Sequence, residues 1–272
     1  LLQVPALALD RLTLSLGDVA NPAFGLQQLT LDYQAGRGTA VLRIGRLRVG
    51  NHDLRALELR CARAALAREA VTCRDARLHL AGRALPFVAD LTANPTRGSA
   101  HLSLRFGHSS QIALALEPDG RVRMRADRLA LADLRRALPS LAAVLGSRGR
   151  DIGAVFERFS PTGTLEATLV WTPATQVPAR LALEAALRDG GFGTSDGLQA
   201  GEQLRLALSL DAQAEALGWN WQARLQWQGG AAYLHPLYIE SGPTVEAEGR
   251  LQGGILNVDR SRARLEGVGE LA

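Results

Sequence analysis

Lysine is absent from this chain of 272 residues, so all 31 basic residues are arginine. The arginines occupy the polar positions of alternating segments, as Arg43, Arg105 and Arg123 do, and no basic cluster interleaves with aromatic residues. The net charge of +4 therefore indicates a solvated protein face, and we expect no nucleic-acid partner. A Walker A phosphate loop is excluded as well, because that loop requires a lysine.

Long apolar runs are also absent. No segment approaches the roughly 18 uncharged apolar residues that a membrane-spanning helix needs. The first residues, LLQVPALALDRLTLSL, contain neither a charged n-region nor a cleavage site, and no methionine starts the chain. The last residues, GVGELA, stop within an alternating pattern. We therefore expect a segment of a longer protein whose targeting signal or membrane anchor lies upstream.

The residues that usually carry catalysis are few and scattered. None of the five histidines has a second His, Cys or carboxylate at metal-ligand spacing, and no G-x-S-x-G is present. Glu246 and Glu248 share one side of a predicted strand, but they lie beside Arg250 on the polar side, which is typical of a charged surface. The sequence predicts no enzyme activity, no metal site and no cofactor.

Only two cysteines are present, Cys61 and Cys73, twelve positions apart. If a hairpin turns near Ala67, the two lie opposite each other on neighbouring strands, where a disulfide can form in an oxidising compartment. In a reducing compartment they would be two small core residues.

The clearest positive signal is the stretch GWNWQARLQWQGG, residues 218–230. Trp219, Trp221, Leu225 and Trp227 alternate with polar residues, which is the period-two pattern of a strand with one dry face. The tryptophans could form a stacking platform for sugars or bases, but their alternation with Leu225 favours a packed apolar face. Most of the chain repeats this pattern with leucine, and we expect an all-β protein built on a long antiparallel sheet.

Strands are expected wherever apolar residues alternate between Gly, Pro and Asn breaks, at 12–16, 29–33, 42–49, 54–60, 87–91, 100–106, 112–116, 122–126, 165–171, 181–187, 204–210, 219–227, 245–251 and 255–265. The segments 42–49 and 54–60 each contain one slip of phase, which a β-bulge produces. The stretch 54–70 also has good helix propensity. We nevertheless favour a hairpin there, because Leu57, Leu59 and Cys61 share one parity.

One segment follows a helical period instead. The spacing of Leu131, Leu134, Leu138, Leu141 and Leu145 predicts an amphipathic helix, which Pro139 would kink or split. We expect a linker at 147–160. It would separate an N-terminal part at 1–146 from a C-terminal part at 161–272, unless one sheet runs through both.

The C-terminal third, GWNWQARLQWQGGAAYLHPLYIESGPTVEAEGRLQGG followed by ILNVDRSRARLEGVGEL, resembles the AsmA-like proteins of Gram-negative envelopes. It is most similar to the YdbH-type members, relatives of TamB. The resemblance implies an inner-membrane anchor outside this segment and a periplasmic, taco-shaped antiparallel sheet. The apolar concave face of such a sheet carries phospholipid between the inner and outer membranes. The family has no catalytic motif.

With that resemblance, the inward positions of the strands become candidates for a lipid groove: Leu102, Leu104, Phe106, Leu114, Leu165, Leu169, Trp171, Leu183, Leu206, Leu208, Trp219, Trp221, Leu225 and Trp227. Two alternatives stay open. The same faces could close against each other in a sandwich or barrel. The chain could also act in envelope assembly, with a sheet edge pairing with strands of an outer-membrane protein.

Overall fold

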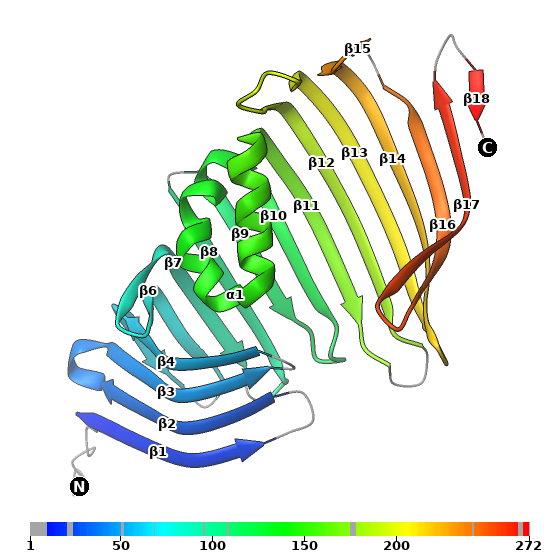
Figure 1. The fold of residues 1–272 in the computed structure, drawn as a ribbon. Helices are drawn as coiled ribbons and strands as arrows, with labels where there is room; N and C mark the ends of the chain where they lie inside the picture. The colour runs from blue at the N-terminus through cyan, green and yellow to red at the C-terminus, as the bar shows by residue number, and fades with distance from the viewer. Residues whose placement is uncertain are drawn as a thin grey trace, which may run out of the picture. The chain divides into compact units, whose positions relative to one another are not determined.

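The computed structural model describes residues 10–20, 24–49, 52–67, 69–94, 96–107, 109–174, 178–240, 242–265 and 269–271 (Figure 1). They are 73% strand and 11% helix, which confirms the all-β class. The chain forms two compact units. The first unit comprises 1–104 and 140–149, and the second comprises 105–139 and 150–272.

The first unit is built on a run of antiparallel strands: β1 (Arg11–Ala20), β2 (Phe24–Gln34), β3 (Thr39–Val49), β4 (His52–Cys61), β5 (Arg63–Leu66), β6 (Val71–Leu80) and β7 (Arg83–Asn94). A short 3-10 helix, η1 (Ala35–Arg37), joins β2 to β3. Strand β6 pairs with β4, β5 and β7. Strand β8 (Ser99–Phe106) contains the division between the units.

The second unit contains the remaining strands: β9 (Ser110–Leu116), β10 (Val122–Ala130), β11 (Thr162–Thr172), β12 (Arg180–Gly193), β13 (Gln199–Glu215), β14 (Gly218–Leu234), β15 (Leu237–Glu240), β16 (Thr244–Gln252), β17 (Ile255–Leu265) and β18 (Gly269–Leu271). Each is antiparallel to its neighbours, and the long strand β14 pairs with both β15 and β16. The antiparallel arrangement is open, so the alternative of a closed barrel is wrong.

Cross-strand register in the first unit follows the predicted alternation. Leu14, Leu31, Leu42, Leu59 and Leu78 are consecutive partners across β1, β2, β3, β4 and β6. The neighbouring positions hold polar residues apart from Val41, and Arg43 donates a hydrogen bond to Glu58 at 2.9 Å. One face of this ladder is thus apolar and the other charged, as a half-buried antiparallel sheet requires.

The expected slips of phase occur at Gly45 and Ala56, but the strand pairings on either side keep one register, so neither is a β-bulge with an extra residue. Gly45 of β3 lies between Gln28 of β2 and Ala56 of β4. Both of these neighbours have a positive φ, 55° at Gln28 and 54° at Ala56. A Cβ on Gly45 would lie 3.0 Å from the Cβ of Gln28 and 3.3 Å from the backbone oxygen of Gln27, so this close approach favours glycine.

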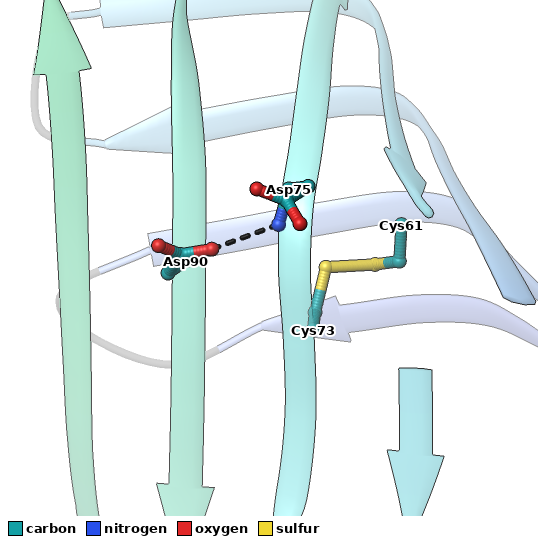
Figure 2. Close-up of a disulfide and its surroundings, with 4 residues drawn as sticks. All are labelled: Cys61, Cys73, Asp75 and Asp90. Atoms are coloured by element: carbon teal, nitrogen blue, oxygen red, sulfur yellow. Dashed lines mark hydrogen bonds between the residues drawn. A yellow bond between two sulfur atoms is a disulfide. The ribbon is translucent and has the colours of Figure 1, made fainter. Parts of the chain in front are cut away.

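The conflict over 54–70 is resolved in favour of strands. Cys61 ends β4, the chain bends at Ala62, and β5 pairs with β6. A disulfide joins Cys61 and Cys73, as Figure 2 shows. The residue directly opposite Cys73 is Ala64 and not Cys61, because the hairpin turn lies later than expected. The disulfide therefore connects β4 to β6 across the start of β5, in a buried cluster with Ala40, Ala76 and Ala89.

The helix α1 (Leu131–Phe159) is longer than expected. It includes Pro139 and continues through 147–159, so the stretch expected to be a linker is helical, and one division between the two units falls within it, after residue 149. The reason lies in the sheet of the second unit, since Phe159 packs edge-on against Phe192 of β12 with ring centres 6.2 Å apart. This tertiary contact stabilises a last helical segment whose glycines disfavour a helix locally.

The start of α1 is held by β9. The buried hydroxyl of Ser110 donates to Asp133 Oδ2 at 2.7 Å and accepts the backbone N–H of Ala130 at 3.0 Å. Asp133 lies in the first helical turn, where a carboxylate is favoured by the helix dipole. Among the described residues, no helix is long and apolar enough to cross a membrane.

Candidate functional site: an open apolar face of the second unit

The second unit carries continuous rows of apolar residues that run across its strands. One row pairs Val122, Trp171, Leu181, Ala212 and Trp221 across β10 to β14. The rows beside it follow the same register: Met124, Leu169, Leu183, Leu210, Ala223 and Ala247, then Ala126, Ala167, Ala185, Leu208, Leu225 and Val245. Because side chains alternate along each strand, all these residues lie on one face of the sheet.

The opposite face is polar. Its rows include Thr168, Glu184, Ser209, Arg224 and Glu246, which are consecutive partners across β11, β12, β13, β14 and β16. Arg224 lies 3.5 Å from Glu246. Exposed ion pairs of this kind contribute little stability, on the order of 0–1 kcal/mol each, but they keep this face in water. The sheet therefore presents one wet and one apolar side.

A groove lies on the apolar face. It has a volume of about 470 Å³, and its walls are Trp171, Leu181, Leu210, Ala212, Trp219, Trp221, Ala223, Leu251 and Leu256. Several of these side chains are open to solvent: Trp171 and Leu251 are each 38% exposed, and Leu256 is 61% exposed. The volume falls in the range of small-molecule sites, and apolar walls are typical of such sites.

A line of left-handed residues bounds these rows. Arg128, Gly163, Asp189, Gln203 and Gly230 lie on the successive strands β10 to β14 and all have positive φ. Each lies where the register shifts, so the five neighbouring strands bulge along one line. Bulges bend a sheet and change which face a side chain points to. Beyond this line Phe192 carries the contact with Phe159 of α1, so the helix covers that end while the tryptophan end stays open.

Three of the predicted groove residues line this groove, namely Trp171, Trp219 and Trp221. Seven others belong to β9 or to the apolar rows that continue away from it: Leu114, Leu165, Leu169, Leu183, Leu206, Leu208 and Leu225. Trp227 follows Leu206 in its row, but a Cβ on Gly242 would lie 1.7 Å from its ring, so the chain crosses directly over this indole.

The remaining three candidates lie elsewhere. Leu102 and Leu104 are in the first unit, where they pack against the cluster around the disulfide. Phe106 belongs to the second unit and is only 3% exposed, so it is a core residue. These three residues satisfy the same alternation as the groove residues, and only tertiary packing distinguishes them.

Sequence reasoning missed six residues of the groove wall: Leu181, Leu210, Ala212, Ala223, Leu251 and Leu256. The alternation predicted the strands that carry five of them, and the inward parity of those strands identifies the apolar side. The missing information is the register between strands, which places Leu251 beside both Trp219 and Leu256.

Two indole N–H groups on this face differ in their partners. Trp227 Nε1 donates to the carbonyl of Gly229 at 2.9 Å. Trp221 Nε1 is buried and has no acceptor among the described residues. A buried donor without a partner is rare in proteins and costs about 1–3 kcal/mol.

The groove on the apolar face offers hydrophobic contact area to a ligand. Within the described part of the chain, no group of three or more His, Cys, Asp or Glu residues could hold a metal ion. The groove walls supply carbon atoms and aromatic rings, which bind apolar chains through buried area and lack the directed polar groups of a specific small-molecule site.

Comparison with known proteins adds no relative: no family model, no curated protein and no solved structure matches this chain.

Proposed function

We propose that this chain is a segment of a periplasmic, bridge-like lipid carrier. In this proposal the apolar face of the sheet binds the acyl chains of phospholipid on their way between the inner and outer membranes. The observation that supports it best is the set of continuous apolar rows from β10 to β14, which end in a groove whose walls remain partly exposed. Large exposed apolar patches usually mark a binding surface.

The energetic argument concerns the barrier to moving a lipid through water. Exposing an acyl chain costs about 0.8 kcal/mol per methylene, so one chain costs on the order of 10 kcal/mol. A wall of leucine, alanine and tryptophan side chains removes most of this cost at every position along the rows. Because neighbouring rows are chemically alike, a bound chain can shift from one to the next without losing contact area.

A second candidate function is a scaffold for envelope assembly. Among the described residues, β17 pairs with β18 from Ala263 to Leu265, and Ile255, Leu256 and Val258 are exposed nearer its start. A strand edge of this kind accepts an added strand from another protein. In that case the bound species would be a peptide at the edge, such as a strand of an outer-membrane protein, in place of a lipid on the face.

Native mass spectrometry of the chain purified without detergent tests the proposal, with organic extraction of whatever co-purifies. Near-stoichiometric phospholipid on the purified chain is the expected result, and photocrosslinking then locates it on the face. A lipid-free chain that also takes up no added lipid would overturn the carrier proposal and favour the scaffold.

A further inference from the structure

A second, smaller recess, lined by both apolar and polar residues, adjoins the apolar groove at one end of the strands. It has a volume of about 180 Å³, and its lining includes Glu215, Gly218, Trp219, Asn220, Arg250 and Leu251. These residues come from the β13–β14 hairpin turn and from the end of β16. The recess therefore lies at the rim of the sheet, where the strands turn back.

The recess and the groove share two walls, Trp219 and Leu251. The two residues are direct cross-strand partners on the apolar face, whereas Asn220 and Arg250 are partners on the polar face. A molecule lying across Trp219 and Leu251 therefore meets carbon on one side and charged groups on the other. Indole rings favour such a boundary, because their bodies are apolar and their edges are polar.

The lining of the recess carries one formal charge of each sign, Glu215 and Arg250, and the carboxylate of Asp259 lies beside Arg250 outside the lining. Arg250 directs Nε and Nη2 to Asp259, at 3.0 and 3.4 Å, whereas a guanidinium has five N–H donors in all. Glu215 accepts a hydrogen bond from the side-chain amide of Asn220. The remaining guanidinium donors suit a phosphate oxygen, and the carboxylate suits an ammonium group.

From this geometry we propose that the recess binds the zwitterionic head of an amphiphile, with its apolar tails in the adjoining groove. Arg250 contacts the phosphate, and Glu215 contacts the ammonium. The inference rests on the carrier function proposed above and adds a preference for one class of lipid. A purely anionic head also contacts Arg250, but the carboxylates of Glu215 and Asp259 repel it. It has no ammonium group to offset that repulsion, so it binds less well than a zwitterion.

Binding of three lipids with identical acyl chains tests this inference: a phosphatidylethanolamine, a phosphatidylglycerol and a diacylglycerol. The zwitterionic lipid should bind the unaltered chain about tenfold more tightly than diacylglycerol, because only its head makes charge-assisted contacts with Arg250 and Glu215. Arg250→Gln and Glu215→Gln should each remove most of that preference and leave diacylglycerol binding unchanged. Glu215→Gln should also improve binding of the anionic lipid.

Arg224→Gln is the matched control, because Arg224 pairs with Glu246 on the same polar face but does not line the recess. It should keep the preference for the zwitterionic head. Equal binding of all three lipids would overturn this inference while the carrier proposal stands, and failure to bind any lipid would overturn both. Tight binding of free phosphoethanolamine, which has no tails, would identify a site for a soluble ligand and would also overturn the inference.

Discussion

Leu225 and Gln222 lie three residues apart on β14 and point to opposite faces of the sheet. Leu225 is 38% exposed on the apolar face, so a charge there reaches solvent when no lipid is bound. We expect Leu225→Asp to leave the fold intact and to abolish lipid binding, because a bound acyl chain would bury the carboxylate. Leu206→Asp should act in the same way from the neighbouring strand. Native mass spectrometry measures the amount of lipid bound per chain in each variant and in the unaltered chain.

Gln222→Asp is the control for both substitutions, because it adds the same charge to the same strand on the polar face. It should bind lipid as the unaltered chain does. Unimpaired binding by both leucine variants would contradict a carrier role for this face.

Gly230 and Gly193 differ in the room that each has for a side chain. Gly230 has a φ of 88°, and a Cβ there would lie 2.4 Å from the carbonyl oxygen of Gln203. Gly193 has nothing within 4 Å of the same position. We expect Gly230→Ala to lower the free energy of unfolding by about 1–3 kcal/mol, whereas Gly193→Ala changes it by less than about 0.5 kcal/mol. Urea denaturation measures both, and equal effects would mean that the bulge line tolerates a side chain.

Asp53 carries the most strongly shifted carboxyl pKa among the described residues. Hydrogen bonds from Arg46, at 2.6 and 2.8 Å, lower its pKa from the usual 3.8 to about 2. Because the folded-state pKa is depressed, this contribution to stability is present above about pH 4 and is lost as the pH falls toward 2. Arg46→Gln should return the pKa toward 3.8, as NMR titration of the carboxyl carbon would report. A value that stays near 2 would assign the shift to other groups.

At the scale of the element, the disulfide is the main covalent constraint on β4, β5 and β6. Both cysteines are buried, at 8% and 4% exposure, and their bond closes a loop with a sequence separation of 12. We expect the double substitution Cys61→Ser with Cys73→Ser to lower the free energy of unfolding by about 2–4 kcal/mol. Chemical denaturation of the variant and of the reduced, unsubstituted chain should agree. No loss of stability in either would show that the core cluster holds these strands without the bond.

The helix α1 is longer than the segment that its sequence predicts to be helical. The spacing of leucines in its first half predicts a helix, whereas the glycines in 147–159 predict that the helix ends before this stretch. The contact between Phe159 and Phe192 belongs to the second unit and is 33 residues distant in sequence. A contact of that range cannot be inferred from propensity, because propensity is a property of neighbouring residues.

At the scale of the whole molecule, the disulfide and the groove belong to different compact units. We expect the double cysteine substitution to accelerate hydrogen exchange in β4 to β7, while exchange in β11 to β14 stays unchanged. The reason is that local opening is governed by the contacts of each cooperative unit. Mass spectrometry of peptides from the two groups of strands measures the exchange rate of each group. Equal acceleration in both groups of strands would show that the two units unfold together.

The alternation of apolar and polar residues determined most of the strands of this protein, along with its all-β class. Period two is a local property, and it survives any arrangement of the strands in space. The parity of Trp219, Trp221 and Leu225 likewise determined which side of β14 is apolar. The approximate position of the backbone irregularity at Gly45 and Ala56 followed from the same pattern, as a slip of phase.

Register was decided only by the tertiary structure. It placed Ala64 opposite Cys73 and put Leu251 between Trp219 and Leu256. Tertiary packing also buried Phe106 in the core, away from the groove. Register also placed Arg250 beside Asn220 at the rim, where the smaller recess meets the groove. The physical reason is that alternation determines only the face of the sheet to which a side chain points. Its neighbours on adjacent strands depend on turns and bulges that lie far away in the chain.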